Sequence, residues 1–229
     1  MPRHMTPRTA AAAIVAAILL IAGTAASRAD SKPQVVIDNA RYTLEKMVGH
    51  PDLKPLPGLL RKAQAVLIVP SLLKAGFFVG GEGGGGVLLA RGKGGEWSNP
   101  AFFSIGAGSF GLQIGFQDSQ VMLLVMSRGT LESMLEAKVK LGADASVSAG
   151  PVGIGFEGGT AINLRADIYS YTLSRGAFLG ASFEGSVTVE DKDRNKAYYG
   201  PDATAHSIQI KRRHSNPGAA ELLRVLSAY

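Results

Sequence analysis

The sequence contains no cysteine. This absence excludes disulfide frameworks, thiolate metal sites, cysteine nucleophiles and a lipidated N-terminal cysteine. Charged residues make up only 18% of the chain and aromatic residues 7%, whereas hydrophobic residues make up 46% and the mean hydropathy is +0.13. This balance excludes a chain that is mostly disordered or a charged tail. The 229 residues suffice for one ordinary domain with a sizeable core.

Catalytic and metal-binding motifs are also missing. His50, His206 and His214 lie far apart and match no metal-ligand spacing. No serine has glycine two residues before and two residues after it, so the nucleophile elbow of the hydrolases is absent. Acid–base catalysis by Glu157 and Glu184 is an alternative, although no sequence motif points to these two residues. We therefore expect a protein that is not an enzyme and that needs neither a cofactor nor a metal.

The N-terminal segment has the three parts of a secretory signal peptide. Arg3 and Arg8 precede an uncharged stretch at 10–26, whose apolar centre gives way to small residues. The stretch is short and rich in alanine, whereas a membrane-spanning helix needs about 20 strongly apolar residues. A retained anchor is the alternative.

Two positions fit signal cleavage, after Ala26 and after Ala29. We expect residues 1–29 to be removed and residues 30–229 to form a single exported domain, periplasmic or extracellular. Cleavage after Ala26 removes Arg3 and Arg8 and lowers the formal net charge from +6 to +4, so the mature protein is mildly basic.

A helix is predicted at 31–48. Ser31 and Gln34 form a capping-box pattern around Pro33. Apolar residues then recur at helical spacing and form one stripe, comprising Ile37, Ala40, Leu44, Met47 and Val48. The pattern is typical of an amphipathic helix.

Most of the remaining chain is predicted to form strands. Residues 65–69 and 121–126 are apolar on both faces, which is typical of buried central strands. Residues 110–117, 143–149 and 177–189 alternate with a period of two, which is typical of half-buried strands.

Two further helices complete the predicted fold. Thr130 is the expected cap of a central helix that ends near Gly142, and Asn216 followed by Pro217 is the expected start of a C-terminal helix. No βαβ alternation is present. We predict an α+β fold with a mostly antiparallel, strongly curved or barrel-like sheet, an N-terminal amphipathic helix, a central helix and a C-terminal helix.

The glycine-rich stretch at 81–86 formally satisfies the nucleotide-binding pattern G-x-G-x-x-G. A phosphate-binding loop must open a helix, however, whereas this stretch runs into the strand-like residues 87–91. We interpret it as a bend or bulge between two paired strands.

Basic residues provide the best candidate for a binding site. An amphipathic helix with cations beside an apolar stripe can lie on an anionic bilayer. The candidate cations for lipid head groups are Lys32, Arg41, Lys46, Arg61 and Lys62, and the candidates for acyl contact are Ile37, Leu44 and Met47. The alternative is that the stripe packs on the sheet and the cations are merely solvated. A second cluster at 211–214 is expected to be a solvated turn, and the modest charge argues against nucleic acid as a partner.

The chain resembles the SYLF domain family, also described as the Ysc84-type actin-binding domain, over residues 35–229. The resemblance rests on motifs that follow one another in order: GFFVGG (76–81), GVLLAR (86–91), WSNPAF (97–102), GSFGLQIG (108–115), LGADA (141–145), GPVG (150–153), YSY (169–171), SRG (174–176) and YYG (198–200). It implies a lipid-binding module, with phosphoinositides and actin as partners of eukaryotic members. It also implies membrane contact by a basic N-terminal segment, here residues 32–46 and an extension to Lys62.

This resemblance and the signal peptide together set the functional expectation. An exported protein would meet neither actin nor phosphoinositides, so we expect it to bind another anionic phospholipid at a membrane surface of the cell envelope. The alternative is a structural or adaptor protein of the envelope that docks another protein through its glycine-rich sheet.

Overall fold

The computed structural model describes residues 32–76, 79–110, 115–150, 166–174, 177–178 and 185–229. Within these ranges the strands are β1 (Ala65–Gly76), β2 (Val79–Ala90), β3 (Ala101–Phe110), β4 (Gly115–Val125), β5 (Val139–Lys140), β6 (Val147–Ala149), β7 (Ile168–Ser174), β8 (Ala177–Phe178) and β9 (Val187–Glu190). The helices are α2 (Pro33–Val48), η2 (Pro51–Leu53), α3 (Leu56–Leu60), α4 (Arg128–Glu136), α5 (Lys192–Tyr199), α6 (Ala205–Gln209), η4 (Pro217–Ala219) and α7 (Ala220–Leu226).

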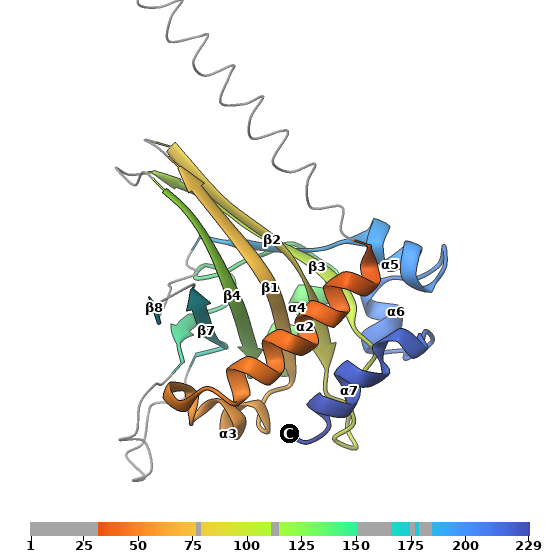
Figure 1. The fold of residues 1–229 in the computed structure, drawn as a ribbon. Coiled ribbons are helices and arrows are strands. Elements are labelled where there is room, and N and C mark those ends of the chain that lie inside the picture. Colours follow the sequence, from red (N-terminus) through yellow and green to blue (C-terminus); the bar gives the residue numbers. More distant parts are fainter. Residues whose placement is uncertain (1–31, 77–78, 111–114, 151–165, 175–176, 179–184) are drawn as a thin grey trace, which may run out of the picture. The chain divides into compact units, whose positions relative to one another are not determined.

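One nine-stranded sheet organises these elements. Its order is β5-β9-β3-β2-β1-β4-β7-β6, and β8 pairs with β7. All pairs are antiparallel except β6 with β7. Figure 1 shows β1 to β4 as long, curving strands side by side. The predicted α+β class, the mostly antiparallel curved sheet and the N-terminal, central and C-terminal helices are confirmed.

Helices cover both faces of the sheet, and each covered face has its own hydrophobic core. In β4, Met122 and Leu124 face the core formed with α2, α3 and α7, which we call the α2 side. Val121, Leu123 and Val125 face the core formed with α4 and α6, which we call the α4 side. Because side chains alternate along a strand, a run that is apolar at every position is buried on both faces.

The glycine-rich stretch lies inside β2, not at a bend between strands. The bulge is in its neighbour β1, where one extra residue is inserted between Val69 and Leu72 relative to β4. A Cβ on Gly86 would overlap the carbonyl oxygen of Ile68 and come within 2.9 Å of Val69 Cγ2. The glycines therefore let β2 lie close to a bulged strand.

Two predicted helix boundaries hold, and both predicted boundaries of the central helix are wrong. The N-terminal helix is α2, which ends at Val48 as expected. Asn216 caps the C-terminal turn, since its side chain accepts a 2.9 Å hydrogen bond from Gly218 N. The central helix, in contrast, is capped by Ser127 rather than Thr130 and ends at Glu136, well before Gly142.

The helices α5 and α6 were not predicted. Asp191 accepts a hydrogen bond from Arg194 N and caps α5. Of the predicted strand at 143–149, only Val147–Ala149 forms a strand. Residues 1–31, 111–114 and 179–184, which carry the expected signal peptide and parts of two predicted strands, lie outside the described residues.

Candidate functional site

The apolar stripe of α2 packs on the sheet. Ile37 is 1% exposed, and Leu44 and Met47 are 0% exposed. All three belong to the core of the α2 side, where α2 contacts β1, β2 and α7. The side chains expected to meet acyl chains are therefore in the core, because this face of the sheet needs an apolar cover. This is the packing alternative left open by the sequence.

The opposite face of α2 carries exposed apolar groups that the sequence analysis missed. Tyr42 is 59% exposed and Val35 is 43% exposed. We define the outer face of α2 as the exposed residues Val35, Asp38, Asn39, Tyr42 and Lys46. Val35 and Tyr42 are seven residues apart, about two helical turns, so they project from the same side. This spacing opposite the stripe is the signal that could have identified them.

The two cations of α2 flank Tyr42 and are held in defined positions. Arg41 Nη1 donates to Glu45 Oε1 at 2.9 Å, and the guanidinium carbon lies 4.2 Å from the centre of the Tyr42 ring. The hydrogen bond to Glu45 raises the pKa of Arg41. Lys46 Nζ donates to Gln120 Oε1 at 3.0 Å, which ties the lysine to β4. The exposed aromatic ring therefore lies between two fixed positive charges.

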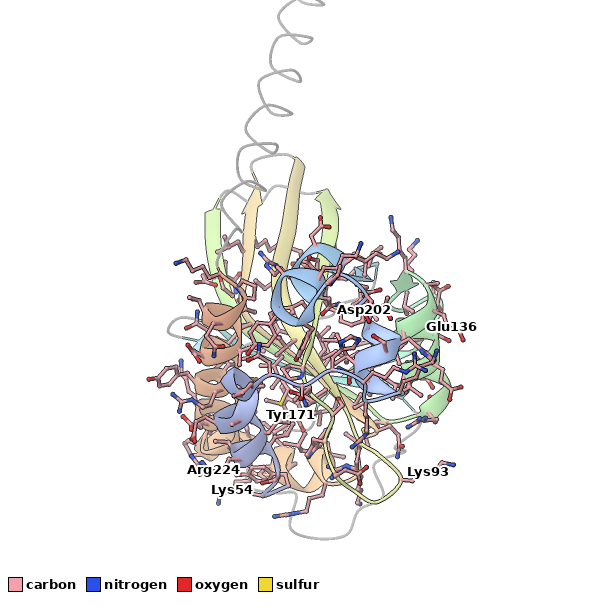
Figure 2. All side chains as sticks on the ribbon, turned by 90° about the vertical axis from the view of Figure 1, so that its right-hand side faces the viewer. Lys54, Lys93, Glu136, Tyr171, Asp202 and Arg224 are labelled. Atoms are coloured by element: carbon pink, nitrogen blue, oxygen red, sulfur yellow. The ribbon has the colours of Figure 1, made fainter. Side chains whose placement is uncertain are left out.

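The other candidate cations lie at the two ends of α2. Lys32 directly precedes the helix and is exposed. Arg61 and Lys62 are exposed and follow α3, which contacts α2, and Arg61 lies 5.9 Å from the ring of Tyr229. Figure 2 shows Lys54 toward the same lower end of α2. The predicted cations thus form no single pocket, but they are distributed along one helix and its neighbour.

Three tyrosines of the described residues have raised pKa values. Burial raises the pKa of Tyr171 and Tyr199, and burial followed by the nearby charge of Asp38 raises the pKa of Tyr198 to about 12. These are structural tyrosines kept neutral. In the part of the chain that the structure describes, no group of acidic or histidine side chains could hold a metal ion, and no helix is long and apolar enough to cross a membrane.

Comparison with known proteins gives consistent relatives. The chain is 34% identical over 181 residues to SH3 domain-containing YSC84-like protein 1 of Xenopus laevis, covering 78% of this chain and 54% of that protein. It is 31% identical over 172 residues to the Homo sapiens protein of the same name, covering 75% and 50%. It is 33% identical over 175 residues to LAS seventeen-binding protein 3 of Saccharomyces cerevisiae, covering 75% and 38%. The chain spans about half or less of the length of these relatives.

A family match covers more than half of the chain. Residues 106–229, from β3 to the C-terminal residue, match the family described as "Ysc84: Las17-binding protein actin regulator". The resemblance identified from the sequence motifs is confirmed at the level of the family. The chain therefore belongs to the Ysc84 family.

Proposed function

We propose that this protein binds anionic phospholipid at a membrane surface, without catalysis, through the outer face of α2 and the cations that adjoin it. The observation that carries the proposal is the exposure of Val35 and Tyr42 on a helix face that also presents Lys46. Among the residues whose side chains the structure describes, two of the three exposed large hydrophobic ones are on this face.

The residue types fit the interface of a bilayer. A tyrosine places its ring among the acyl chains near the head groups and keeps its hydroxyl in water. Each lysine or arginine near an anionic surface contributes on the order of 1 kcal/mol. Lys32, Arg41, Lys46, Arg61 and Lys62 remain our candidates for head-group contact, with Tyr42 and Val35 in the apolar role.

In this proposal α2 stays docked on the sheet while it binds. Ile37, Leu44 and Met47 remain in the core, so acyl contact is limited to the residues of the outer face. The contact is shallow and depends on charge, so salt should weaken it. Export, as expected from residues 1–29, would place this contact in the periplasm or outside the cell, away from actin.

The alternative role as an envelope adaptor is favoured by one observation on the sheet. Leu73 in β1 is 42% exposed and pairs with Gly83 of the glycine-rich strand β2. The names of the relatives include an SH3 domain and binding to LAS seventeen, and those words describe the relatives. An adaptor would retain its partner when the outer face of α2 is changed.

Co-sedimentation with vesicles tests the lipid proposal. Residues 30–229 are mixed with phosphatidylcholine vesicles and with vesicles that also contain phosphatidylglycerol, at low and high salt. The expected result is binding that requires the anionic lipid and falls as salt is added. The double charge reversal Lys46→Glu with Lys62→Glu should weaken this binding about tenfold or more, since two attractive charges become repulsive.

The matched control reverses two exposed lysines on the far side of the sheet. Lys138→Glu with Lys140→Glu changes the net charge by the same amount, and Lys140 ends the short strand β5. Equal loss in both variants would mean that total charge governs binding. Binding to neither kind of vesicle would refute the proposal and leave the adaptor role.

A further inference from the structure

A second cationic surface lies on the segment that joins α6 to η4. Lys211, Arg212 and Arg213 are consecutive and exposed. Lys93, in the turn between β2 and β3, is exposed beside Glu96, to which Arg212 is bonded. We define the basic corner as Lys93, Lys211, Arg212 and Arg213. Within the described residues no ion pair is formed by Lys93, Lys211 or Arg213, so three of its four cations have no carboxylate partner there.

The backbone of the basic corner is fixed in an unusual conformation. Arg212 has a φ of +51°, the left-handed region that a non-glycine residue adopts only where its surroundings hold it there. Lys211 N donates to His206 O at 3.2 Å, and Arg213 N donates to Ser207 O at 3.0 Å. The segment is thus secured to α6 on both sides of the strained residue.

The side chain of Arg212 completes this arrangement by clamping the β2–β3 turn. Its Nη1 lies 2.8 Å from Glu96 Oε1, and its Nη2 donates to Glu96 O at 2.9 Å. A Cβ on Gly92 would overlap both Glu96 Oε1 and Arg212 Nη2, so any other residue there would displace the two side chains of the clamp. The clamp leaves Lys211 and Arg213 exposed on either side of Arg212. Strained residues held in this way are concentrated at functional sites.

The basic corner is separate from the outer face of α2. It follows α6, which packs on the α4 side, whereas α2 covers the opposite face of the sheet. In Figure 2 Lys93 lies at the lower right while the ribbon of α2 runs along the left. A flat bilayer against the outer face of α2 would therefore leave the basic corner free for another partner.

We propose that the basic corner is a docking site for an acidic polypeptide segment. Among the residues whose side chains the structure describes, the exposed large hydrophobic ones are Val35, Tyr42 and Leu73, and none of them belongs to the basic corner. The basic corner therefore lacks the apolar group with which a protein enters a bilayer. Carboxylates complement both the arginine and the lysine side chains of the basic corner. Arginine binds a carboxylate through two parallel hydrogen bonds, and lysine binds it as a point charge. A fixed backbone reduces the entropy lost on binding. The inference does not depend on the lipid proposal.

Fluorescence anisotropy with a labelled oligoglutamate peptide tests this site on residues 30–229. The expected result is binding that weakens with salt and falls roughly tenfold in the variant Lys211→Glu with Arg213→Glu, since each reversal removes one attraction and adds one repulsion. The matched control is Lys46→Glu with Lys62→Glu, which changes net charge equally and should leave peptide binding intact.

The same two variants distinguish this proposal from the lipid proposal. In the vesicle assay the Lys211 and Arg213 variant should behave as the unchanged protein. Equal loss of peptide binding in both variants, or no binding by the unchanged protein, would overturn the docking site. Loss of vesicle binding with the peptide unaffected would identify the basic corner as a membrane contact and would also overturn it.

A third variant tests whether the clamp matters beyond its charge. Glu96→Gln removes a negative charge next to the basic corner, so simple electrostatics predicts tighter peptide binding. We expect weaker binding instead, because the ion pair that holds Arg212 is lost. Tighter or unchanged binding would contradict the role of the clamp.

Discussion

Gly86 shows how one missing side chain sets the spacing of two strands. The bulge in β1 contains Pro70, which has no amide hydrogen to give to a neighbouring strand. The inserted residue pushes the Ile68 carbonyl toward β2, where Gly86 leaves room for it. The glycine-rich stretch at 81–86, which formally matches a nucleotide-binding pattern, is thus explained by the close packing of β2 against a bulge.

Substitution of this glycine should destabilise the fold. Gly86→Ala forces a methyl group onto the Ile68 carbonyl oxygen, where the nearest atoms are backbone and cannot easily move. We expect a loss of about 1–3 kcal/mol in the free energy of unfolding, measured by urea denaturation. Gly81→Ala is the control, since its Cβ would lie 3.6 Å from Ala107 O, an ordinary contact. Equal loss in the two variants would contradict this explanation.

For single residues of α2, the sequence predicted which side chains share one face but not what that face contacts. The periodic stripe identified Ile37, Leu44 and Met47 as one face, and they share one core. Whether that face met lipid or sheet could not be predicted, because both environments favour the same apolar spacing. Tyr42 was missed because Val35, seven residues before it, is the only apolar residue of the outer face that lies in line with it, and a pair is a much weaker periodic signal than the five-residue stripe.

At the scale of elements, one face of α2 has a structural role and the opposite face has the proposed binding role. The stripe packs on β1, β2 and α7, while Tyr42 and Val35 face outward. Changes on the two faces should therefore have different effects.

Two single substitutions in α2 test this separation. Leu44→Ala should lower the free energy of unfolding by about 2–5 kcal/mol, because it leaves a cavity in the core. Tyr42→Ala should change it by less than about 1 kcal/mol, since only an exposed ring and its contact with Arg41 are lost. Vesicle binding, measured on the folded fraction of each variant, should be weakened by Tyr42→Ala and unchanged by Leu44→Ala. A large loss of stability in Tyr42→Ala would show that the outer face also supports the fold.

Short helices were the elements least accessible to prediction. The residues of α5 carry no apolar stripe, and the helix is fixed by a buried polar side chain instead. Asn195 Oδ1 accepts a 2.8 Å hydrogen bond from Phe102 N, and its Nδ2 donates to Glu190 Oε1 at 3.0 Å. The hydrogen bond with Phe102 joins residues 93 positions apart in sequence, so local periodicity does not reveal it. Only the buried parts of β1 and β4 were predicted as central strands, at 65–69 and 121–126, because burial on both faces leaves a continuous apolar run.

At the scale of the whole molecule, the two cores share one sheet. Adjacent residues of β4 face opposite cores, so loss of one core removes support from the strands of the other. The domain should unfold as one cooperative unit.

Paired substitutions in the two cores test this coupling. Leu222→Ala in α7 and Ile208→Ala in α6 each remove a buried side chain, one from the α2 side and one from the α4 side. Each should lower a single midpoint of thermal unfolding, with circular dichroism and tryptophan fluorescence giving the same curve. Trp97 belongs to the core of the α2 side, so fluorescence reports on that core. If circular dichroism of the Ile208 variant showed an unfolding transition that fluorescence did not, the two cores would melt separately.

The packing of the first described helix against the last has a consequence for how the chain is made. Gln34 in α2 donates a 2.9 Å hydrogen bond to Gly218 O at the start of the C-terminal turn, and α2 contacts α7. On the ribosome, α2 emerges long before the residues that complete its cover. The nascent chain thus carries a partly uncovered apolar helix until α7 has been synthesised, which makes this interval the time when a chaperone has most to shield.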